Sequence, residues 1–520
     1  MIAISCSTRS LFPATFHRHV SCSMRSVDDV LPLIFIVVIF MQTSTICAVA
    51  TAPGGALGVV RVAGPDALAV TDRVFRARSG RPLTERRSHT LAFGHLVDPA
   101  DETIVDEVLV SVFRAPHSYT GEEATEISCH GSTYILQRVV QLLLAAGAAP
   151  AEPGEFTRRA FLNGKMDLSQ AEAVADLIAS STAASHRVAM SQMRGHFSQR
   201  LAGLREQLLQ LTSLLELELD FSDHEDLEFA DRSELDAVAA AVERETARLA
   251  DSFATGNALR EGWPVAIVGA TNAGKSTLLN ALLQDDRAIV SDVHGTTRDV
   301  VEDTFVLGGV LFRFIDTAGL RDTTDRVEQM GIERSRRQLQ LARTVIFVVD
   351  VNCAESQLAA LSDEVFGART EGRVIVAVNK ADCLQRDGED DALSSARRAA
   401  VEAAVREAAR ARNVDPQVLF LSAKEGEGVA ELCRTLVATA AAAQETEGDV
   451  VVTNARHYAA LSAALDDVRR VRQGLQSGLS GDFVAQDLRE CLHHLAEITG
   501  GEVTTDEVLG TIFKNFCVGK

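Results

Sequence analysis

The spacing of apolar residues changes along the chain, and each change predicts a domain boundary. Short apolar runs at Gly58–Val62 and Val105–Val112 alternate with Gly and Pro turns, and a helix is predicted over Tyr134–Ala146. From 168 to 258, apolar residues recur every three or four positions, as in helices, with a polar interruption at 220–231. The pattern therefore predicts a small α+β domain followed by a helical segment.

From Trp263 onward, β-branched runs alternate with helical patterns, as a doubly wound α/β domain requires. The predicted strands are VAIVG, LFRFID, TVIFVVD, RVIVAVN and QVLFLSA. Helical spacing then returns from Arg456 to Phe516, so the α/β domain is predicted to be inserted in a helical domain. The predicted boundaries are 44–166 for the α+β domain, 167–258 and 444–520 for the two helical parts, and 259–443 for the inserted domain.

The length, composition and charge of the chain limit the classes of protein to which it can belong. A chain of 520 residues exceeds the roughly 250 to 300 residues that one core supports. With 46% hydrophobic and 24% charged residues, the composition is that of soluble globular proteins. The formal net charge of −21 disfavours non-specific nucleic-acid binding, which depends on Lys and Arg neutralising phosphates, so an RNA partner would need a local basic patch. The nine cysteines form no CxxC pair, which favours a reducing compartment.

Residues 1–43 form an extra N-terminal segment. Its apolar run, Leu31–Met41, has about ten residues and is shorter than the roughly 20 that span a bilayer, so no stable membrane association is expected. Residues 1–27 contain arginines and serines without acidic residues, as in transit peptides, and a secretory signal is a third interpretation. We expect a misassigned start, with translation from Met41 and a cytoplasmic protein. A genuine transit peptide would instead place the protein in an organelle.

The sharpest motif is Gly269–Ser276, which matches G-x-x-x-x-G-K-[ST] between a predicted strand and a predicted helix. In this loop, backbone amides surround phosphates at a helix N-terminus. Lys275 adds positive charge at the β- and γ-phosphates, and Ser276 ligates Mg²⁺. The motif predicts a nucleoside triphosphate site.

Three further motifs follow in the order of a guanine-nucleotide fold. Asp316 to Gly319 (DTAG) ends a strand, so that Asp316 can reach the Mg²⁺ shell and the Gly319 amide the γ-phosphate. In Asn379 to Asp382 (NKAD), the Asp382 carboxylate can accept from N1-H and the exocyclic amine of guanine, a donor pair that adenine lacks. Ser422 to Lys424 (SAK) is suited to hold the base through backbone amides. The four motifs together predict GTP rather than ATP.

Between these motifs lies Gly295–Asp299 (GTTRD), in which Thr297 is the candidate switch residue that contacts Mg²⁺ and the γ-phosphate. Leu320 follows DTAG, where a Ras-type enzyme has a water-orienting Gln, so hydrolysis cannot use that device. The residues predicted to bind nucleotide are Asn272, Ala273, Gly274, Lys275, Ser276, Thr277, Ser291, Thr297, Asp316, Thr317, Ala318, Gly319, Asn379, Lys380, Asp382, Ser422, Ala423 and Lys424.

With these residues in place, the chain from Thr45 to Lys520 resembles the MnmE or TrmE family of tRNA-modification GTPases. The specific matches lie outside the inserted domain: ATAPGGALGVVRV from Ala50, YTGEEATEISCHG from Tyr119, PGEFTRRAFLNGKMDLSQAEAVADLI from Pro153, and the terminal FCVGK. The resemblance implies an N-terminal domain that dimerises and binds a 5-formyl- or 5,10-methylene-tetrahydrofolate one-carbon donor. The matching positions are Arg61, Glu126, Lys165 and Lys520, each of which could otherwise be a surface charge, and Cys517 is expected near them as a catalytic or bystander thiol.

The family resemblance also implies a hydrolytic mechanism. K⁺ offsets the charge that develops between the phosphates, and its implied ligands are Asn272, Ser291, Val293 and Thr296. The implied catalytic residues are Lys275, Thr297 and Glu328, the last of which positions the attacking water through a second water unless it is a plain surface carboxylate. Thr271 and His294 depart from the family pattern, and His294 leaves the strength of K⁺ activation open.

The resemblance implies partners as well. An FAD-containing protein of the MnmG (GidA) type is expected to form a heterotetramer with the homodimer, and together they install a carboxymethylaminomethyl-type group at C5 of the tRNA wobble uridine. The negative charge favours a flavoprotein that supplies most of the tRNA-binding surface. Two other classes share the nucleotide motifs: a ribosome-assembly GTPase of the Era or Der kind, which would need a KH-type module with a GXXG loop, and a GTPase tethered to a membrane by 31–41.

Overall fold

The computed structural model describes the chain in two compact units. One unit contains the residues up to Met166 together with those from Thr505 onward, and the other is Asp167–Thr504. The described residues are 44–220, 232–283, 289–290, 303–315, 339, 342–367, 373–384, 391–444, 450–501, 506–514, 516 and 519.

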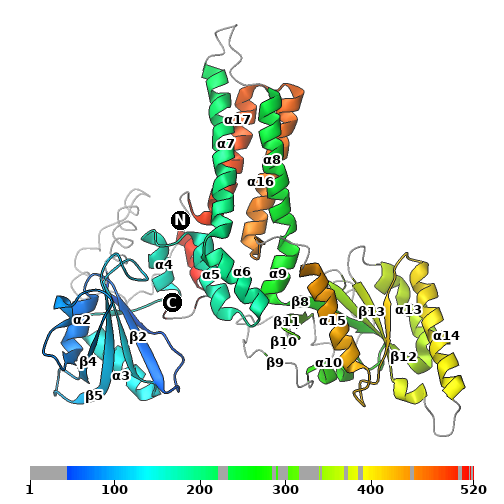
Figure 1. Ribbon diagram of the computed structural model, residues 1–520, viewed down its shortest axis with the longest axis horizontal. Coiled ribbons are helices and arrows are strands. Elements are labelled where there is room, and N and C mark those ends of the chain that lie inside the picture. The colour runs from blue at the N-terminus through cyan, green and yellow to red at the C-terminus, as the bar shows by residue number, and fades with distance from the viewer. Residues whose placement is uncertain are drawn as a thin grey trace, which may run out of the picture. The chain divides into compact units, whose positions relative to one another are not determined.

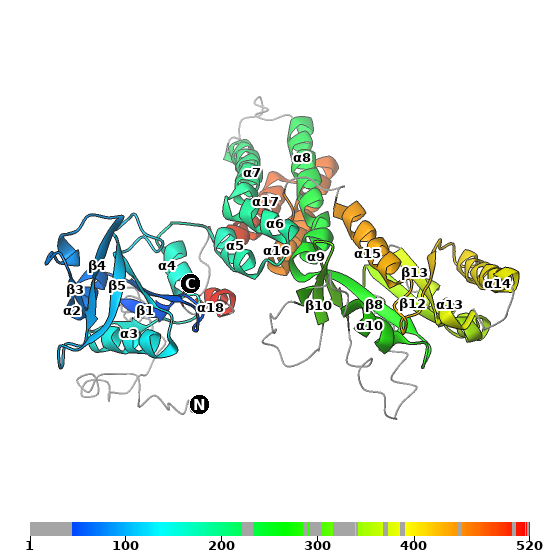
Figure 2. The same ribbon diagram turned by 60° about the horizontal axis from the view of Figure 1, so that its bottom comes forward.

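The first unit is built on a seven-stranded sheet with the order β3-β4-β5-β6-β2-β1-β7. Its strands are β1 Ile46–Val49, β2 Leu57–Ala63, β3 Phe75–Ala77, β4 Thr90–Val97, β5 Ile104–Phe113, β6 Ala124–His130 and β7 Ala149–Pro150. Helices α2 (Ala67–Val74) and α3 (Thr133–Ala145) pack on one face, as Figure 2 shows, and the short helix η3 (Leu83–Glu85) follows β3. Alternation along β4 and β5 sends one set of side chains into this core and the other set to the opposite face.

The end of the chain packs on this unit. Helix α18 (Asp506–Phe513) contacts α4 (Glu155–Leu162). Gly154, which precedes α4, has φ +67°. A Cβ there would lie 2.8 Å from the Phe513 carbonyl oxygen and 2.9 Å from Cβ of Phe516, so this contact requires glycine. We expected 444–520 to be one helical part, but the contacts of its last residues place them with the first unit.

The helical part of the second unit is a bundle of long helices. Helices α7 (His196–Asp220), α8 (Arg232–Asp251), α16 (Ala455–Ser477) and α17 (Gly481–Thr499) lie side by side in Figure 1 and share one apolar core. Shorter helices α5 (Leu168–Ala179), α6 (Ala183–Met193) and α9 (Phe253–Glu261) pack at the bundle's base. A capping box at Asp167 starts α5, and another at Thr182 starts α6.

The rest of the second unit is an α/β domain with the sheet order β14-β13-β12-β8-β11-β10-β9. The strands are β8 Trp263–Gly269, β9 Ile289–Val290, β10 Asp303–Leu307, β11 Val310–Phe314, β12 Thr344–Asp350, β13 Arg373–Asn379 and β14 Gln417–Phe420. Helices α10 (Lys275–Leu283) and α15 (Val429–Gln444) pack on one face, and α13 (Ala354–Gly367) and α14 (Asp391–Arg410) pack on the other. Two short 3₁₀ helices, η4 (Val351–Cys353) and η5 (Ala381–Leu384), follow β12 and β13.

The five predicted strands of this domain are confirmed as β8, β11, β12, β13 and β14, which pair in parallel. The sheet also contains β10, which pairs antiparallel with β11 and carries β9 beyond it. These short edge strands were not predicted. The fold class is as expected: a P-loop α/β domain inserted in a helical domain and preceded by an α+β domain.

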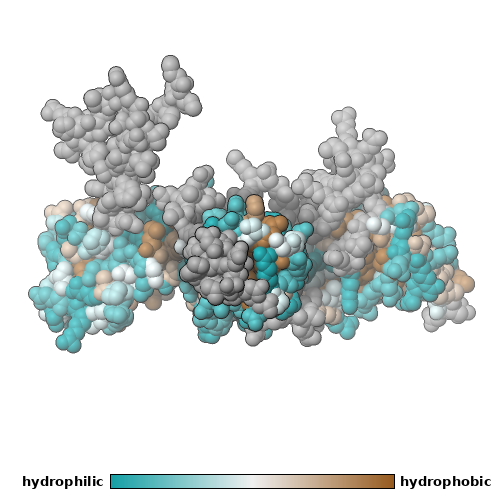
Figure 3. All heavy atoms as spheres, turned by 90° about the horizontal axis from the view of Figure 1, so that it is seen from above, coloured by the Kyte–Doolittle hydropathy of each residue, from teal (hydrophilic) through white to brown (hydrophobic). Residues whose placement is uncertain are grey.

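The surface fits the composition. Hydrophilic side chains cover much of the described surface on the face shown in Figure 3. Across the part of the chain that the structure describes, no helix is long and apolar enough to cross a bilayer. The N-terminal run 31–41 lies outside that part, as does most of the predicted polar interruption at 220–231.

Candidate nucleotide-binding site

The loop between β8 and α10 has the backbone conformation that a phosphate site needs. Gly269, Asn272 and Gly274 have φ values of +155°, +63° and +97°. A Cβ at Gly269 would lie 2.3 Å from the Val348 carbonyl oxygen, so the loop lies directly against β12. The chain then enters α10 at Lys275, whose first amides point out of the helix N-terminus. This loop can therefore present backbone donors to an anion.

Lys275 folds back over the same loop. Its Nζ donates to the carbonyl oxygens of Gly269 at 2.8 Å and Ala270 at 2.9 Å. Burial lowers the pKa of this amine from its usual value because desolvation disfavours the charged form. A phosphate group beside the amine would oppose that effect and favour its charged state.

Asn379, at the end of β13, joins two loops. Its Nδ2 donates to the Ala273 carbonyl oxygen at 2.8 Å, and its Oδ1 accepts from the Ala423 amide at 3.0 Å. The side chain is 3% exposed, so both bonds lie away from water. One amide therefore fixes the phosphate loop and the Ser422–Lys424 loop to a single strand end.

Asp382 lies beside the second of these loops with an exposed carboxylate. A hydrogen bond from Ser422 is the main reason why the pKa of Asp382 lies below its usual value, so the group is ionised at neutral pH. Ser422 is itself buried, and its amide donates to the Glu427 carbonyl oxygen at 2.9 Å. An ionised, pre-positioned acceptor is what the N1-H and amino group of guanine require.

Asp350 was missed by the sequence reasoning. Its carboxylate lies 2.7 Å from Nζ of Lys380 and also accepts from the Asn352 amide at 2.9 Å. Lys380 has φ +62°, so the residue that makes this ion pair also has left-handed backbone. The only sequence signal was an aspartate at the end of a buried strand, which sequence alone cannot pair with a particular lysine.

The structure thus brings together the phosphate loop, Asn379 to Asp382, and Ser422 to Lys424, where Lys424 pairs with exposed Glu425 at 2.9 Å. The other predicted nucleotide, metal and catalytic residues lie outside the described residues: Ser291, Val293, Thr296, Thr297, Asp316, Thr317, Ala318, Gly319 and Glu328.

A second cluster contains two of the predicted folate residues. Nε of Arg61 donates to Oε1 of Glu126 at 2.9 Å, and Nη1 of Arg61 donates to the Gly519 carbonyl oxygen at 3.3 Å. The guanidinium carbon lies 5.4 Å from the ring centroid of Tyr119 and 5.6 Å from that of Phe156. The tail and the sheet therefore meet at one half-buried arginine.

Lys165 reaches the loop that carries Tyr119. Its Nζ donates to the Pro116 carbonyl oxygen at 2.9 Å, and its aliphatic stem lies near Gly121. Gly519 has φ +97°, and a Cβ there would lie 2.3 Å from the Val49 carbonyl oxygen, so the tail lies tightly against β1. Cys517 and Lys520 lie within two positions of this glycine in the sequence but are outside the described residues.

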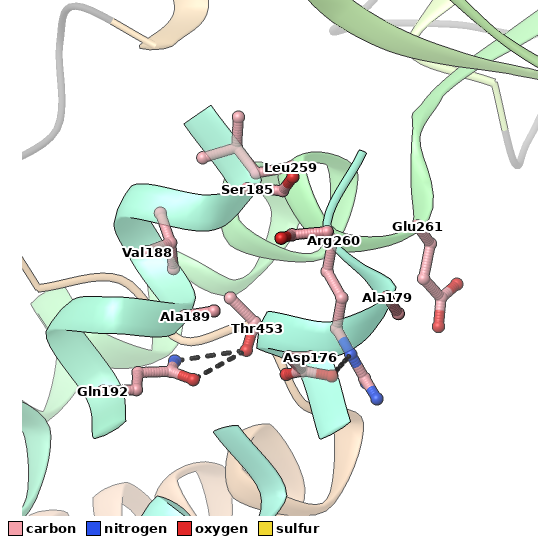
Figure 4. A pocket seen from close by; sticks show the side chains of 11 residues that line it. Asp176, Ala179, Ser185, Val188, Ala189, Gln192, Leu259, Arg260, Glu261 and Thr453 are labelled. Atoms are coloured by element: carbon pink, nitrogen blue, oxygen red, sulfur yellow. Dashed lines mark hydrogen bonds and ion pairs between the residues drawn. The ribbon is translucent and has the colours of Figure 1, made fainter. Parts of the chain in front are cut away.

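A cavity of about 170 Å³ lies where the chain enters and leaves the inserted domain (Figure 4). Arg260 and Glu261, which line the cavity, come just before the inserted domain in the chain, and Thr453, which also lines it, comes just after. Nε of Arg260 lies 2.7 Å from Oδ1 of Asp176, whose pKa is raised by burial. The Gln192 side-chain amide donates to Oγ1 of Thr453. The polar side chains Arg260, Asp176, Gln192 and Thr453 are thus bonded in pairs and stabilise the junction between the helical part and the inserted domain.

The fold, the phosphate loop and the aspartate suited to guanine define a P-loop GTPase. The N-terminal and helical regions add what the GTPase class does not have in general, and both match family models. Residues 45–165 match the model described as GTP-binding protein TrmE N-terminus, and residues 168–517 match the MnmE helical domain. The chain therefore belongs to the family of the tRNA modification GTPase MnmE.

Curated relatives agree with this assignment. The chain is 54% identical over 484 residues to the tRNA modification GTPase MnmE of Bacteroides thetaiotaomicron, covering 92% of this chain and 100% of the relative. It is 53% identical over 483 residues to that of Bacteroides fragilis, with the same coverage. Among solved structures, the G domain of the T. maritima FeoB iron transporter is 26% identical and covers 34% of this chain and 98% of its own, with a TM-score of 0.23.

Proposed function

We propose that the protein hydrolyses GTP in a K⁺-stimulated cycle and, with a flavoprotein, installs a carboxymethylaminomethyl-type group at C5 of the tRNA wobble uridine. The observation that carries the nucleotide assignment is the Asn379 side chain, which holds the phosphate loop and the base loop together beside the ionised Asp382. Membership of the MnmE family supports tRNA as the substrate.

Replacing the Asp382 carboxylate by an amide tests whether this residue selects guanine. In Asp382→Asn, an amide NH₂ replaces a carboxylate oxygen, so the site would donate where it formerly accepted. Xanthine has a carbonyl oxygen where guanine has its amino group. We therefore expect the variant to bind xanthosine nucleotides, and we expect its affinity for GTP to fall by at least about a hundredfold. Equal GTP binding by wild type and variant would contradict the assignment.

The metal ions would bind at the phosphate loop. Ser276, at the first turn of α10, would ligate Mg²⁺ together with Thr297, and Asn272 would be the K⁺ ligand within the loop, with Ser291, Val293 and Thr296 as its partners. Asn272 is exposed and has left-handed backbone, which supports its proposed role as a K⁺ ligand. Cations here would supply charge that offsets the anionic phosphates. We expect faster hydrolysis in K⁺ than in Na⁺; equal rates would remove K⁺ from the proposal.

The one-carbon donor would bind beside Arg61. Guanidinium and ammonium groups at Arg61, Lys165 and Lys520 suit folate carboxylates, and Glu126 suits the N-H groups of a pterin. The close approach of the tail to Arg61 supports this, because it accounts for a motif at the far end of the chain. Tetrahydrofolate affinity measured by calorimetry should fall at least about tenfold in Glu126→Gln, in which one acceptor is lost. Cys517 stays a candidate beside this site.

The homodimer would form through the open sheet face of the first unit. Phe93 and Leu109 are directly opposed across β4 and β5, on the face away from α2 and α3. They are 40% and 45% exposed, and neighbouring Leu91 is 63% exposed. Ultracentrifugation of Phe93→Lys should show a monomer, whereas Phe483→Lys, at an exposed helical position, should stay dimeric.

The FAD-containing partner of the MnmG type would carry the redox chemistry, with a cytoplasmic location for the complex. Wobble nucleosides from cells with and without this gene, measured by mass spectrometry, test the whole proposal. Unchanged nucleosides would overturn it.

A further inference from the structure

Positive charge is concentrated at one edge of the first unit. Residues 73–87 contain six arginines and one acidic residue, Glu85, which gives +5 from six minus one. The whole chain carries −21, so this short segment has the opposite sign to the protein around it. Such a segment is electrostatically distinct from a mixed, solvated surface.

The segment has a defined structure. It begins in α2, continues through β3 at the outer edge of the sheet, and turns through η3 into β4. The Asp72 carboxylate accepts from the amides of Leu83 at 2.8 Å and Thr84 at 3.1 Å. Nη2 of Arg86 donates to Oγ of Ser79 at 2.7 Å. Asp72 and Arg86 thus hold the turn, and Asp72 has its charge directed at backbone amides.

Four other arginines form the exposed surface that we call the arginine edge: Arg76, Arg78, Arg81 and Arg87. Within the described part of the chain, no side-chain contact engages Arg78 or Arg87. Arg76 and Arg81 donate to backbone carbonyl oxygens of their own segment, and they lie 3.7 Å from the carboxylates of Glu102 and Glu85 respectively, in ion pairs whose side chains are 45% to 73% exposed. Exposed ion pairs of this kind contribute little to stability, so a phosphate group can replace the carboxylates as partners of these arginines.

We propose that the arginine edge binds the phosphate backbone of the RNA substrate; this inference rests on the proposed function in tRNA modification. A chain with a net charge of −21 repels a polyanion, so RNA must approach through a local region of opposite sign. Guanidinium groups bind phosphate oxygens in bidentate fashion and stay charged at all physiological pH values. The surface positions the RNA and leaves base recognition to other residues.

Substitution of three arginines tests the inference on the full-length protein. Arg78→Gln, Arg81→Gln and Arg87→Gln are combined, and binding to labelled tRNA is followed by fluorescence anisotropy over a series of salt concentrations. We expect about tenfold weaker binding near 0.1 M salt and a log K against log salt slope that is smaller by about 2. A triple Arg→Lys variant at the same positions keeps the charge and should keep most of the affinity.

The matched control removes three exposed arginines of the inserted domain, in the last part of α14 and just after it: Arg406→Gln, Arg410→Gln and Arg412→Gln. It changes net charge equally and should leave tRNA affinity within about twofold. Equal weakening in both triple variants would show a general charge effect and overturn the inference. Unchanged tRNA binding together with weakened binding of the flavoprotein would also overturn it, in favour of an acidic protein surface.

Failure of this inference can be told apart from failure of the proposed function. If cells without the gene keep normal wobble nucleosides, the proposed function fails. If those cells lose the modification and the arginine variant restores it at wild-type tRNA affinity, the inference alone fails. The substituted arginines lie in the first unit and the nucleotide site lies in the second. GTP hydrolysis by the purified arginine variant should therefore equal that of wild type in either case.

Discussion

Gly274 leaves just enough room for the Asn379 side chain. A Cβ on Gly274 would lie 2.2 Å from Nδ2 of Asn379, and that nitrogen donates to the neighbouring Ala273 carbonyl oxygen at 2.8 Å. The glycine of the phosphate loop is therefore required twice, by its φ of +97° and by the approach of the asparagine.

Asn379→Ala should weaken GTP binding by at least about tenfold. Two buried hydrogen bonds are lost, each of which contributes about 1 kcal/mol, and the Ala423 amide is left without its acceptor. Binding of a fluorescent GDP analogue measures the effect. Asn413→Ala, at an exposed left-handed position before β14, serves as the control and should bind as wild type does.

Nucleotide should protect Cys383 from alkylation. The Cys383 thiol lies 3.7 Å from Oδ2 of Asp382, so a base bound at that carboxylate would cover it. With GDP at about ten times its Kd, the rate of iodoacetamide labelling at Cys383 should fall about tenfold, because the free protein falls to about a tenth. Peptide mass spectrometry gives the rate at each cysteine. ATP should give no protection; protection by both nucleotides would mean that the effect does not come from guanine recognition.

Glu172 makes the helical domain sensitive to acid. Burial raises the pKa of Glu172, but hydrogen bonds and positive charge from His457 and Arg456 outweigh burial and bring it down to about 2. A depressed carboxylate pKa stabilises the folded state above the unfolded value near 4.5, and this stabilisation is lost as the pH falls from about 4.5 to about 2. Urea unfolding of wild type across this range should show the decline.

Glu172→Gln isolates that contribution. The variant should lose about 3 kcal/mol of unfolding free energy at pH 7, because the ion pairs of Glu172 with Arg456 and His457 are broken and both partners lose their counter-charge. It should also show a flatter decline in acid than wild type. Glu402→Gln removes an exposed carboxylate from an i, i+4 pair with Arg406 and should change stability by less than about 0.5 kcal/mol. Parallel acid profiles for Glu172→Gln and wild type would contradict the role of Glu172.

Two glycines separate backbone strain from tail contact. Gly154 and Gly164 have φ values of +67° and +68°, but a Cβ at Gly164 meets nothing within 4 Å, whereas one at Gly154 meets Phe513 and Phe516. Gly164→Ala should cost about 1 kcal/mol of stability. Gly154→Ala should add the clash, so that hydrogen exchange across 506–514 speeds up. Equal exchange in both variants would show that the tail contact does not depend on Gly154.

Local sequence accounts for much of the fold and of the nucleotide site. The phosphate loop lies between a buried strand and a helix start, and the length and β-branched residues of a run such as RVIVAVN favour a buried strand. Five strands of the inserted domain and helix α3 were predicted on this basis. Strand β10 was missed because its sequence, DTFVL, is short and mixes polar with apolar residues.

The remaining features depend on contacts that no local pattern specifies. Asn379 bonds to Ala273, 106 positions away, and Arg61 bonds to Gly519, 458 positions away. Lys380 and Asp350 pair across two neighbouring strand ends, and the register of those strands is set by the whole sheet. The helical spacing from 456 to 516 was recognised, but periodicity alone cannot tell which surface the last helix packs on.

The docking of the last residues on the first unit has a consequence for biosynthesis. The ribosome releases the sheet early, whereas Gly519 and Phe516, which complete its packing, emerge only after the bundle and the inserted domain. The first unit is therefore expected to wait, incompletely covered, while the bundle and the inserted domain are translated and folded. Its readiness to receive a ligand at Arg61 then depends on residues that are made 458 positions further along the chain.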